Sequence, residues 1–466
     1  MRRTHSSQPW RLASAPASAR RLLCLAAAAG LVLLQGSTAG IAQSYSIPIS
    51  QPAPEPSGPA PGGSTPGTPI PGTPAPGGPV PGGPVQVSVT GGPAPVNTQR
   101  LGIETAVREM VPEARAAQVT LVSAAPALAP LDPSADETVQ ATVQVLAPAR
   151  SPERVTLPVA LVNVAAQWSD AQVLLVSNSP ERIAFGKVLY NASLPNGQTV
   201  RLLYHHQNGS TTQRMTIEVA LSNPARSPIT LWVNGASGGP AADELLIGHA
   251  AAYRFLEQYG LHAGFLLQIP ANTTVPLLVH DLPPLGVVSG IAQFTLVDGD
   301  RLNLQVFARL AGEMDPPTES FQSDFDNVHQ RGAFTGPKIE RSLTFAAGGP
   351  PVLMTLGDNA DLLHEGATGI ALQGNYGVIY TFNVLVSNPT SDPAVAALVM
   401  HADGGQARGT FLIDNQLING PTVQPNAPQV ITTIHLAPGA SRTLRVTTMP
   451  ESGSNYPVHL LLGPPP

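Results

Sequence analysis

Short apolar runs, in which apolar and polar residues alternate, dominate the chain after residue 98. Clear examples are residues 138–146, 155–164 and 172–176. Successive side chains of a β-strand point to opposite faces, so a period of two is typical of half-buried strands. Clusters of Asn, Gly, Pro and Ser separate the runs, which favours short strands joined by turns. The pattern predicts a mainly β protein with two tandem antiparallel β-sandwich domains.

The first predicted sandwich covers residues 177–311 and includes one short helix. Two apolar runs flank Pro195-Asn196-Gly197, and Asn-Gly is typical of a tight β-hairpin. The helix is expected over 242–259, with Gly260 at its C-cap. Its apolar face at helical spacing comprises Leu245, Leu246, His249, Tyr253 and Leu256.

The second predicted sandwich covers residues 338–466 and repeats landmarks of the first. The sequence Val-Ala-Leu-Ser-Asn-Pro at 219–224 matches Val-Leu-Val-Ser-Asn-Pro at 384–389. We interpret this match as a duplication, although similar turn chemistry could also produce it. Residues 312–337 are expected to form an acidic, exposed linker. Residues 98–176 are β-rich, apart from a helical patch at 104–117 that Pro112 interrupts, and form either a separate domain or part of the first sandwich.

The N-terminal region predicts an export signal followed by a spacer. Residues 1–42 contain five Arg and no acid, then an apolar run over 22–34 and small residues before Gln43. Residues 43–97 follow as a Pro/Gly-rich spacer, in which 22 of the 33 residues at 52–84 are Pro or Gly. Such a segment cannot form a packed core, so we expect it to be disordered. It would act either as a stalk or as a linker with no specific role.

Composition and charge limit the cellular locations and the classes of partner that we expect for this protein. The formal net charge is −6, which argues against nucleic-acid binding. The single Cys lies at position 24, so neither a disulfide framework nor a Cys-based metal site is expected. No transmembrane segment is expected after signal cleavage. We therefore expect an exported protein, located in the periplasm, at the cell surface or outside the cell.

Several blocks resemble, in their order, an uncharacterised family of secreted bacterial proteins. The resemblance covers roughly residues 170–463 and concerns a family known mainly from cyanobacteria and defined only as a domain of unknown function. It implies a secreted β-rich protein and supplies no catalytic residues. The blocks that carry it are Val176-Ser177-Asn178-Ser179-Pro180-Glu181, Gly186-Lys187-Val188-Leu189, Leu203-Tyr204-His205-His206, Leu221-Ser222-Asn223-Pro224 and Gly374-Asn375-Tyr376-Gly377-Val378-Ile379-Tyr380.

Candidate metal ligands are mostly histidines. His205 and His206 are adjacent, and imidazole is a common metal ligand, but neighbours in a strand point to opposite faces. A site formed by both would need the strand to bend or end there. Three further histidines of the same unit could converge on them: His249, His262 and His280. The acidic segments 324–327 and 358–361 resemble partial calcium loops but lack the full ligand set, so solvated turns are the better interpretation.

The sequence contains no His-Glu-x-x-His zinc-hydrolase motif, no phosphate-cradling loop and no dinucleotide-binding fingerprint. We therefore expect no enzyme activity and no cofactor. The expected function is a structural or surface-interaction module of the cell envelope, with an unidentified protein or glycan as partner. The first alternative is a carbohydrate- or small-ligand-binding module that uses Asn375, Tyr376 and Tyr380, although Gly374 and Gly377 could equally mark a tight bend there. A metal-dependent hydrolase is the second alternative and the third hypothesis overall.

Overall fold

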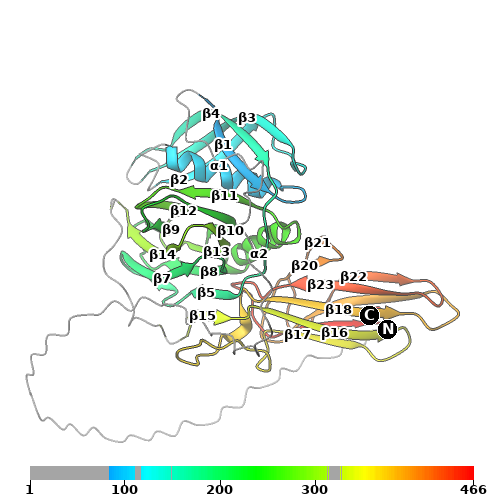
Figure 1. Cartoon of the computed structure of the whole chain (residues 1–466). Coiled ribbons are helices and arrows are strands. Elements are labelled where there is room, and N and C mark those ends of the chain that lie inside the picture. Colours follow the sequence, from blue (N-terminus) through cyan, green and yellow to red (C-terminus); the bar gives the residue numbers. More distant parts are fainter. Residues whose placement is uncertain (1–82, 111–116, 148–149, 312, 314–325, 327) are drawn as a thin grey trace, which may run out of the picture. The chain divides into compact units, whose positions relative to one another are not determined.

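The computed structural model describes residues 83–110, 117–147, 150–311, 313, 326 and 328–466. The predicted signal peptide, the spacer as far as residue 82 and most of the 312–337 linker lie outside the described residues. The described chain is mainly β and forms several sheets, which confirms the predicted fold class (Figure 1). No helix in the described ranges is long and apolar enough to cross a membrane.

The largest sheet forms one layer of the first sandwich. It contains both antiparallel pairs and parallel pairs, such as β1 with β4 and β5 with β8. A short strand, β6 (Arg182–Ile183), pairs with β8 beside the main path. The strand order is β15 (Arg331–Thr335), β5 (Val173–Ser177), β8 (Thr199–Asn208), β13 (Val287–Asp298), β10 (Ile229–Ala241), β11 (Gly264–Ile269), β1 (Val85–Thr90), β4 (Glu153–Asn163), β3 (Asp136–Leu146) and β2 (Gln118–Ala125).

A four-stranded sheet forms the other layer of the first sandwich. Apolar side chains from both sheets and from α1 (Val96–Met110) form one continuous core, in which Val200, Ile217 and Leu304 are fully buried. Burial of this apolar surface is the main force that holds the two layers together. The strand order of the smaller sheet is β12 (Thr273–Leu282), β9 (Met215–Asn223), β14 (Arg301–Leu310) and β7 (Lys187–Pro195).

The second sandwich comprises a five-stranded and a four-stranded sheet. Val384, Leu398 and Leu460 belong to its buried core. The order in the larger sheet is β16 (Lys338–Ala346), β18 (Ile379–Ser387), β23 (Ser441–Thr448), β20 (Thr410–Ile413) and β21 (Gln416–Asn419). The order in the smaller sheet is β17 (Val352–Leu356), β24 (Val458–Gly463), β19 (Ala394–Ala402) and β22 (Gln429–Leu436).

The long helix α2 (Glu244–Gly260) links the two sandwiches. Its N-cap residue Asp243 accepts a hydrogen bond from the Leu246 N–H at 3.0 Å. The buried face of α2 contains Ala252, Phe255 and Leu256, which belong to the same core as the second sandwich. The predicted apolar face is partly wrong, because the Leu246 side chain is 49% exposed. The buried face instead includes Ile247, Gly248 and Ala251, which the predicted face did not contain.

The N-terminal spacer ends earlier than residue 97, because residues 85–90 form β1. Val85, Val87 and Val89 are buried, while β1 pairs with β4 on one side and with β11 on the other. Flanking Pro and Gly residues hide this short alternating pattern in the sequence. The segment 98–176 contributes β2, β3 and β4 to the same sheet as the first sandwich. The predicted helical patch belongs to α1, which begins at Val96 and ends before Pro112.

Two further expectations about local structure are corrected. The strands that flank Asn196-Gly197 do not form a hairpin, because β7 pairs with β14 and β8 pairs with β13 and β5. Only Gly197 has a positive φ, at 75°, whereas a type I′ hairpin turn needs two such residues. The turn therefore carries the chain from one sheet to the other. The predicted 312–337 linker also contains β15, whose Phe334 is fully buried.

Candidate functional site

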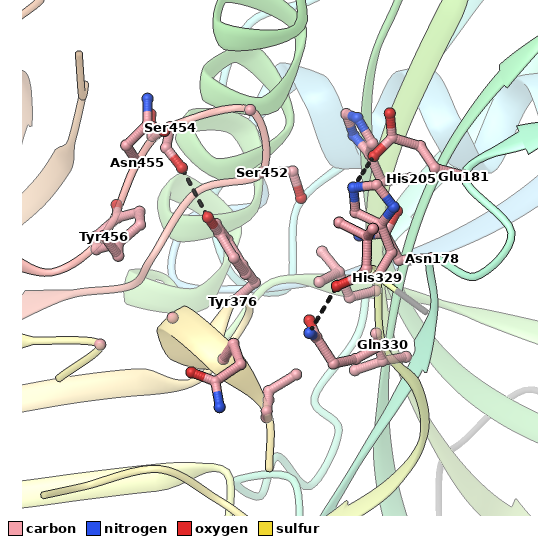
Figure 2. A pocket seen from close by; sticks show the side chains of 18 of the residues that line it. Asn178, Glu181, His205, His329, Gln330, Tyr376, Ser452, Ser454, Asn455 and Tyr456 are labelled. Carbon is pink, nitrogen blue, oxygen red and sulfur yellow. Dashed lines mark hydrogen bonds and ion pairs between the residues drawn. The ribbon is translucent and has the colours of Figure 1, made fainter. Parts of the chain in front are cut away.

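A polar pocket of about 490 Å³ lies where the first sandwich, the start of α2 and the second sandwich meet (Figure 2). We call it the junction pocket. The first sandwich and α2 contribute the polar residues Asn178, Glu181, His205, Glu244, His329 and Gln330. The second sandwich contributes Asp358, Asn359, Gln373, Tyr376, Ser452, Ser454, Asn455 and Tyr456. Both halves of the described chain are therefore needed to form its walls.

His205 reaches the junction pocket because of the alternation along β8. Leu202 and Tyr204 of this strand point into the core of the first sandwich, while Leu203 belongs to the core shared with the second sandwich. His205 follows the direction of Leu203 and lines the pocket. The residue is only 3% exposed, and burial lowers the pKa of His205 to about 4. The imidazole is therefore neutral near pH 7, and its Nδ1 has no hydrogen-bond partner among the described residues.

His206 does not share this site, so the predicted pairing of the two histidines is wrong. Its Nε2 lies 2.9 Å from the Ser177 hydroxyl, and its Nδ1 lies 3.1 Å from the Pro180 carbonyl oxygen. Both ring nitrogens are thus engaged inside the protein. The strand continues without a bend at this point, so neighbouring side chains point to opposite faces.

Glu181 is held in place by a charged network beside His205. Its carboxylate lies 2.7 Å from His329 Nε2, and His329 Nδ1 lies 2.7 Å from Asp326. The hydrogen bond to Glu181 is the main reason that the pKa of His329 rises to about 9. Partial burial is the largest single influence on Glu181 and opposes its ionisation, but the hydrogen bond from His329 and the nearby imidazole charges together outweigh burial and lower the pKa of the carboxyl. Glu181 is therefore a positioned, ionised carboxylate.

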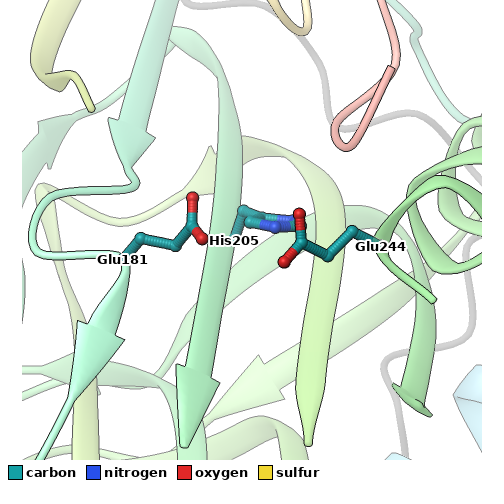
Figure 3. A group of neighbouring side chains, drawn as sticks. All are labelled: Glu181, His205 and Glu244. Atoms are coloured by element: carbon teal, nitrogen blue, oxygen red, sulfur yellow. The ribbon is translucent and has the colours of Figure 1, made fainter. Parts of the chain in front are cut away.

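Glu244 brings a second carboxyl to the same point. It is the first residue of α2, and the candidate ligand atoms of Glu181, His205 and Glu244 all lie within 4.8 Å of one another. Figure 3 shows the His205 ring between the two carboxyl groups. Burial and then repulsion from Glu181 raise the pKa of Glu244. These three side chains have the residue types that commonly hold a divalent metal ion.

Tyr376 forms the aromatic part of the pocket wall. Its hydroxyl donates a hydrogen bond of 2.8 Å to the Ser454 carbonyl, and its ring meets the Tyr456 ring edge-on with centroids 5.5 Å apart. Burial raises the pKa of Tyr376 to about 12, so the hydroxyl stays protonated at neutral pH. The structure thus brings Tyr376 and His205, two residues selected from the sequence, into one pocket.

The other two predicted ligand-binding residues, Asn375 and Tyr380, have structural roles and do not line the junction pocket. Both are fully buried. The Asn375 amide donates hydrogen bonds to the Asp361 carbonyl at 2.7 Å and to the Tyr380 hydroxyl at 2.8 Å. Gly374 has a φ of 74°, which agrees with the tight bend considered as the alternative. These residues shape the loop that presents Tyr376.

The remaining histidines do not converge on His205. His249 bonds Glu451 and Asn419 at 2.9 and 2.8 Å, and His262 stacks on Trp168 with ring centroids 4.1 Å apart. His280 Nε2 lies 2.7 Å from the Tyr204 hydroxyl. In the two acidic segments, Asp326 contacts His329, while Asp361 contacts Arg341 and is not part of the pocket lining. Asp324 lies outside the described residues.

Sequence reasoning missed Glu181, Glu244 and His329 as site residues. Glu181 ends a block quoted for the family resemblance, and Glu244 follows the helix N-cap, but neither position signals a ligand by itself. His329 lies in the segment that we expected to be a linker. Only the tertiary fold brings these three side chains together, since they are separated by more than sixty residues along the chain.

Comparisons with known proteins give no family. No protein-family model matches the sequence, and no curated protein matches it. Among solved structures, tripeptidyl peptidase 2 is 10% identical with a TM-score of 0.16, and the match covers 71% of this chain but 26% of that one. The exported protein XepA of PBSX is 12% identical with a TM-score of 0.15, covering 59% of this chain and 85% of that one. Lac15 from a marine microbial metagenome is 11% identical with a TM-score of 0.13, covering 81% and 96%. Likenesses this weak carry no argument about function.

Proposed function

We propose that the protein is a non-enzymatic, exported binding module whose junction pocket takes a hydroxyl-rich small ligand, such as a saccharide unit of an envelope or extracellular glycan. The supporting observation is that carboxylates, side-chain amides and a tyrosine ring converge in one pocket from both sandwiches. Its volume of about 490 Å³ falls within the usual range for small-molecule sites.

The chemistry of the pocket wall suits neutral polyhydroxyl compounds. Carboxylates such as Glu244 accept hydrogen bonds from sugar hydroxyls, and amides such as Gln373 both donate and accept them. The exposed Gln373 side chain is free to reorient toward a ligand. Tyr376 adds an apolar ring surface beside these polar groups. The mixture favours a sugar over a purely apolar ligand.

This proposal selects the small-ligand alternative over a purely structural module. A structural module needs no concave polar surface, whereas the junction pocket is lined by side chains from separate sheets and from α2. The exported location rests on the basic and apolar pattern of residues 1–42. The two parts of the proposal are compatible, because envelope and extracellular glycans are reached only after export.

A glycan array with matched variants tests the ligand. We expect the wild-type protein to bind a restricted set of glycans, and both Gln373→Ala and Tyr376→Ala to weaken that binding at least tenfold. Tyr376→Phe keeps the ring and should retain most of the binding. Tyr253→Ala, which changes a partly buried tyrosine of α2 outside the pocket lining, serves as the control. Absence of any glycan signal, or equal signals in all variants, would reject the proposal.

One observation favours a second candidate, the metal-dependent hydrolase. The Glu181, His205 and Glu244 side chains could hold an ion that activates water at the pocket wall. The two candidates differ in turnover. A glycan that is bound and released unchanged over hours supports a binding module, whereas release of shortened products supports the hydrolase.

A further inference from the structure

His205 presents a buried polar atom that lacks a partner. The residue is 3% exposed, and its Nδ1 has no hydrogen-bond partner among the described residues. A buried nitrogen left without a partner destabilises the fold, so native proteins usually supply one. Because the ring lines the junction pocket, that partner can come from the solvent side.

Two carboxyl groups face this imidazole. Glu181 approaches from the turn before β6 and Glu244 from the start of α2, with the candidate ligand atoms of all three residues within 4.8 Å (Figure 3). Two carboxylates at such a separation repel each other, and a cation between them would remove that repulsion. The cluster therefore combines an unused nitrogen with an excess of negative charge, because His329 pairs with Glu181 and not with Glu244.

The surroundings of Glu181 resemble the outer shell of a metal site. His329 bonds the Glu181 carboxylate and is itself held by Asp326, whose carboxylate also accepts the Glu181 backbone N–H at 3.0 Å. The Ser179 hydroxyl donates to the same Asp326 at 3.2 Å. Such outer-shell bonds fix the direction of a ligand before the ion binds. Glu244 is exposed at a helix start and can adjust to complete the coordination.

We propose that Glu181, His205 and Glu244 form a binding site for one divalent transition-metal ion, with Zn²⁺ as the preferred ion. An imidazole nitrogen with two carboxylates suits Zn²⁺, whereas Ca²⁺ and Mg²⁺ prefer oxygen ligands alone. Three protein ligands leave a coordination position open, and this position faces the junction pocket. The inference goes beyond the proposed glycan binding, since the cluster needs no organic ligand to bind the ion.

Titration calorimetry on metal-free, full-length protein tests the site. We expect one Zn²⁺ per chain with micromolar or tighter affinity, weaker Mn²⁺ binding, and Ca²⁺ binding at least about 100-fold weaker than Zn²⁺. Glu244→Gln and Glu181→Gln should each weaken Zn²⁺ binding by about 10-fold or more. Glu257→Gln, on the same helix but outside the cluster, should match the wild type.

Two results would overturn the site. The first is a wild-type titration that shows no heat of Zn²⁺ binding at one ion per chain. The second is a Zn²⁺ affinity that neither Glu244→Gln nor Glu181→Gln changes. Circular dichroism of each variant shows whether it is folded, and Glu244→Gln alters an exposed side chain, so this variant keeps the test decisive. X-ray absorption at the zinc edge should show a nitrogen and oxygen shell. A glycan array run without metal separates failure of this site from failure of glycan binding.

Discussion

Tyr204 and His280 form a buried polar pair in the core of the first sandwich. The Tyr204 hydroxyl lies 2.7 Å from His280 Nε2, and both residues are less than one-tenth exposed. Burial, followed by the nearby charge of Arg108, lowers the pKa of His280 from its ordinary 6.5 to about 3. Burial also lowers the pKa of His206 to about 3. These histidines remain neutral in the folded protein while the unfolded chain takes up protons.

The folded protein should therefore lose stability as the pH falls below 6.5. A depressed folded-state pKa means that the stabilising contribution is present above the unfolded value and is lost as the pH falls toward the folded value. Between pH 7 and pH 5, each such histidine removes about 2 kcal/mol from the free energy of unfolding. Urea unfolding at both pH values should show His280→Gln losing about 2 kcal/mol less than the wild type over this interval.

His435→Gln is the matched control for this pH effect. His435 lies on β22 with its side chain exposed, so this variant should keep the wild-type loss between pH 7 and pH 5. If His280→Gln showed the same pH dependence as the wild type, protonation of His280 would not be linked to unfolding.

At the scale of elements, two asparagines stabilise equivalent turns in the two sandwiches through side-chain hydrogen bonds. Asn223 is the last residue of β9, and its amide donates to the carbonyls of Ser227 and Ile269 at 2.8 and 3.1 Å. Asn388 follows β18, and its amide donates to the carbonyls of Asp392 and Leu436 at 2.8 and 3.2 Å. In both cases the strand pairs with a later strand of its own sheet, β12 or β23. The repeated Ser-Asn-Pro sequence thus makes the same contacts twice.

Replacing either asparagine should destabilise the protein by a similar amount. Asn223→Ala and Asn388→Ala each leave buried carbonyls without donors, at a cost of about 2–3 kcal/mol. Asn383→Ala removes a single exposed bond to Glu340 and should cost less than about 1 kcal/mol. Chemical denaturation measures all three, and a loss from Asn383→Ala as large as that from Asn388→Ala would refute the proposed role of the turns.

Most strands were predictable because alternation directly reflects burial on one face. The strand pairing was not predictable from local turn chemistry, as the Asn196-Gly197 turn between two different sheets demonstrates. β1 was missed because the surrounding Pro and Gly residues dominate a local window, while its pairing partners lie far along the chain. The pairing of strands that are distant in the sequence therefore determines the sheet arrangement, which local composition does not specify.

The candidate site was only partly predictable for the same reason. His205, Tyr376 and Tyr380 were identified by residue type, and Asn375 was included because it precedes Tyr376 in the same block. The structure buries the Asn375 and Tyr380 side chains and satisfies their polar atoms. Glu181, Glu244 and His329 come from three separate segments, so a single sequence contains no local signal that joins them.

At the scale of the whole molecule, α2 is packed directly against the loop that follows β23. A Cβ added at Gly248 would lie 1.7 Å from the Ser452 carbonyl oxygen, which is far inside van der Waals contact. Ser452 and Gly453 also line the junction pocket. The absence of a side chain at Gly248 therefore permits the close approach that forms one wall of the pocket.

Gly248→Ala should separate α2 from this loop. Because the obstructing atom belongs to the backbone, the loop must shift, and we expect a stability loss of about 2–4 kcal/mol together with weaker glycan binding. The nearest atoms to a Cβ added at Gly260, on the same helix, belong to the Leu412 side chain, which can rotate, so the effect of Gly260→Ala should be smaller. Thermal unfolding and glycan binding of the two variants provide the comparison. Equal behaviour of the variants would contradict this account of the contact.

The central claim is that the junction pocket is a ligand-binding site. The most direct measurement is a crystal structure of the full chain with the glycan that binds most strongly on the array. Our account predicts an ordered sugar in contact with the Tyr376 ring and within hydrogen-bond distance of Glu244 and Gln373. A sugar bound on another surface, with no ligand between these three residues, would contradict it.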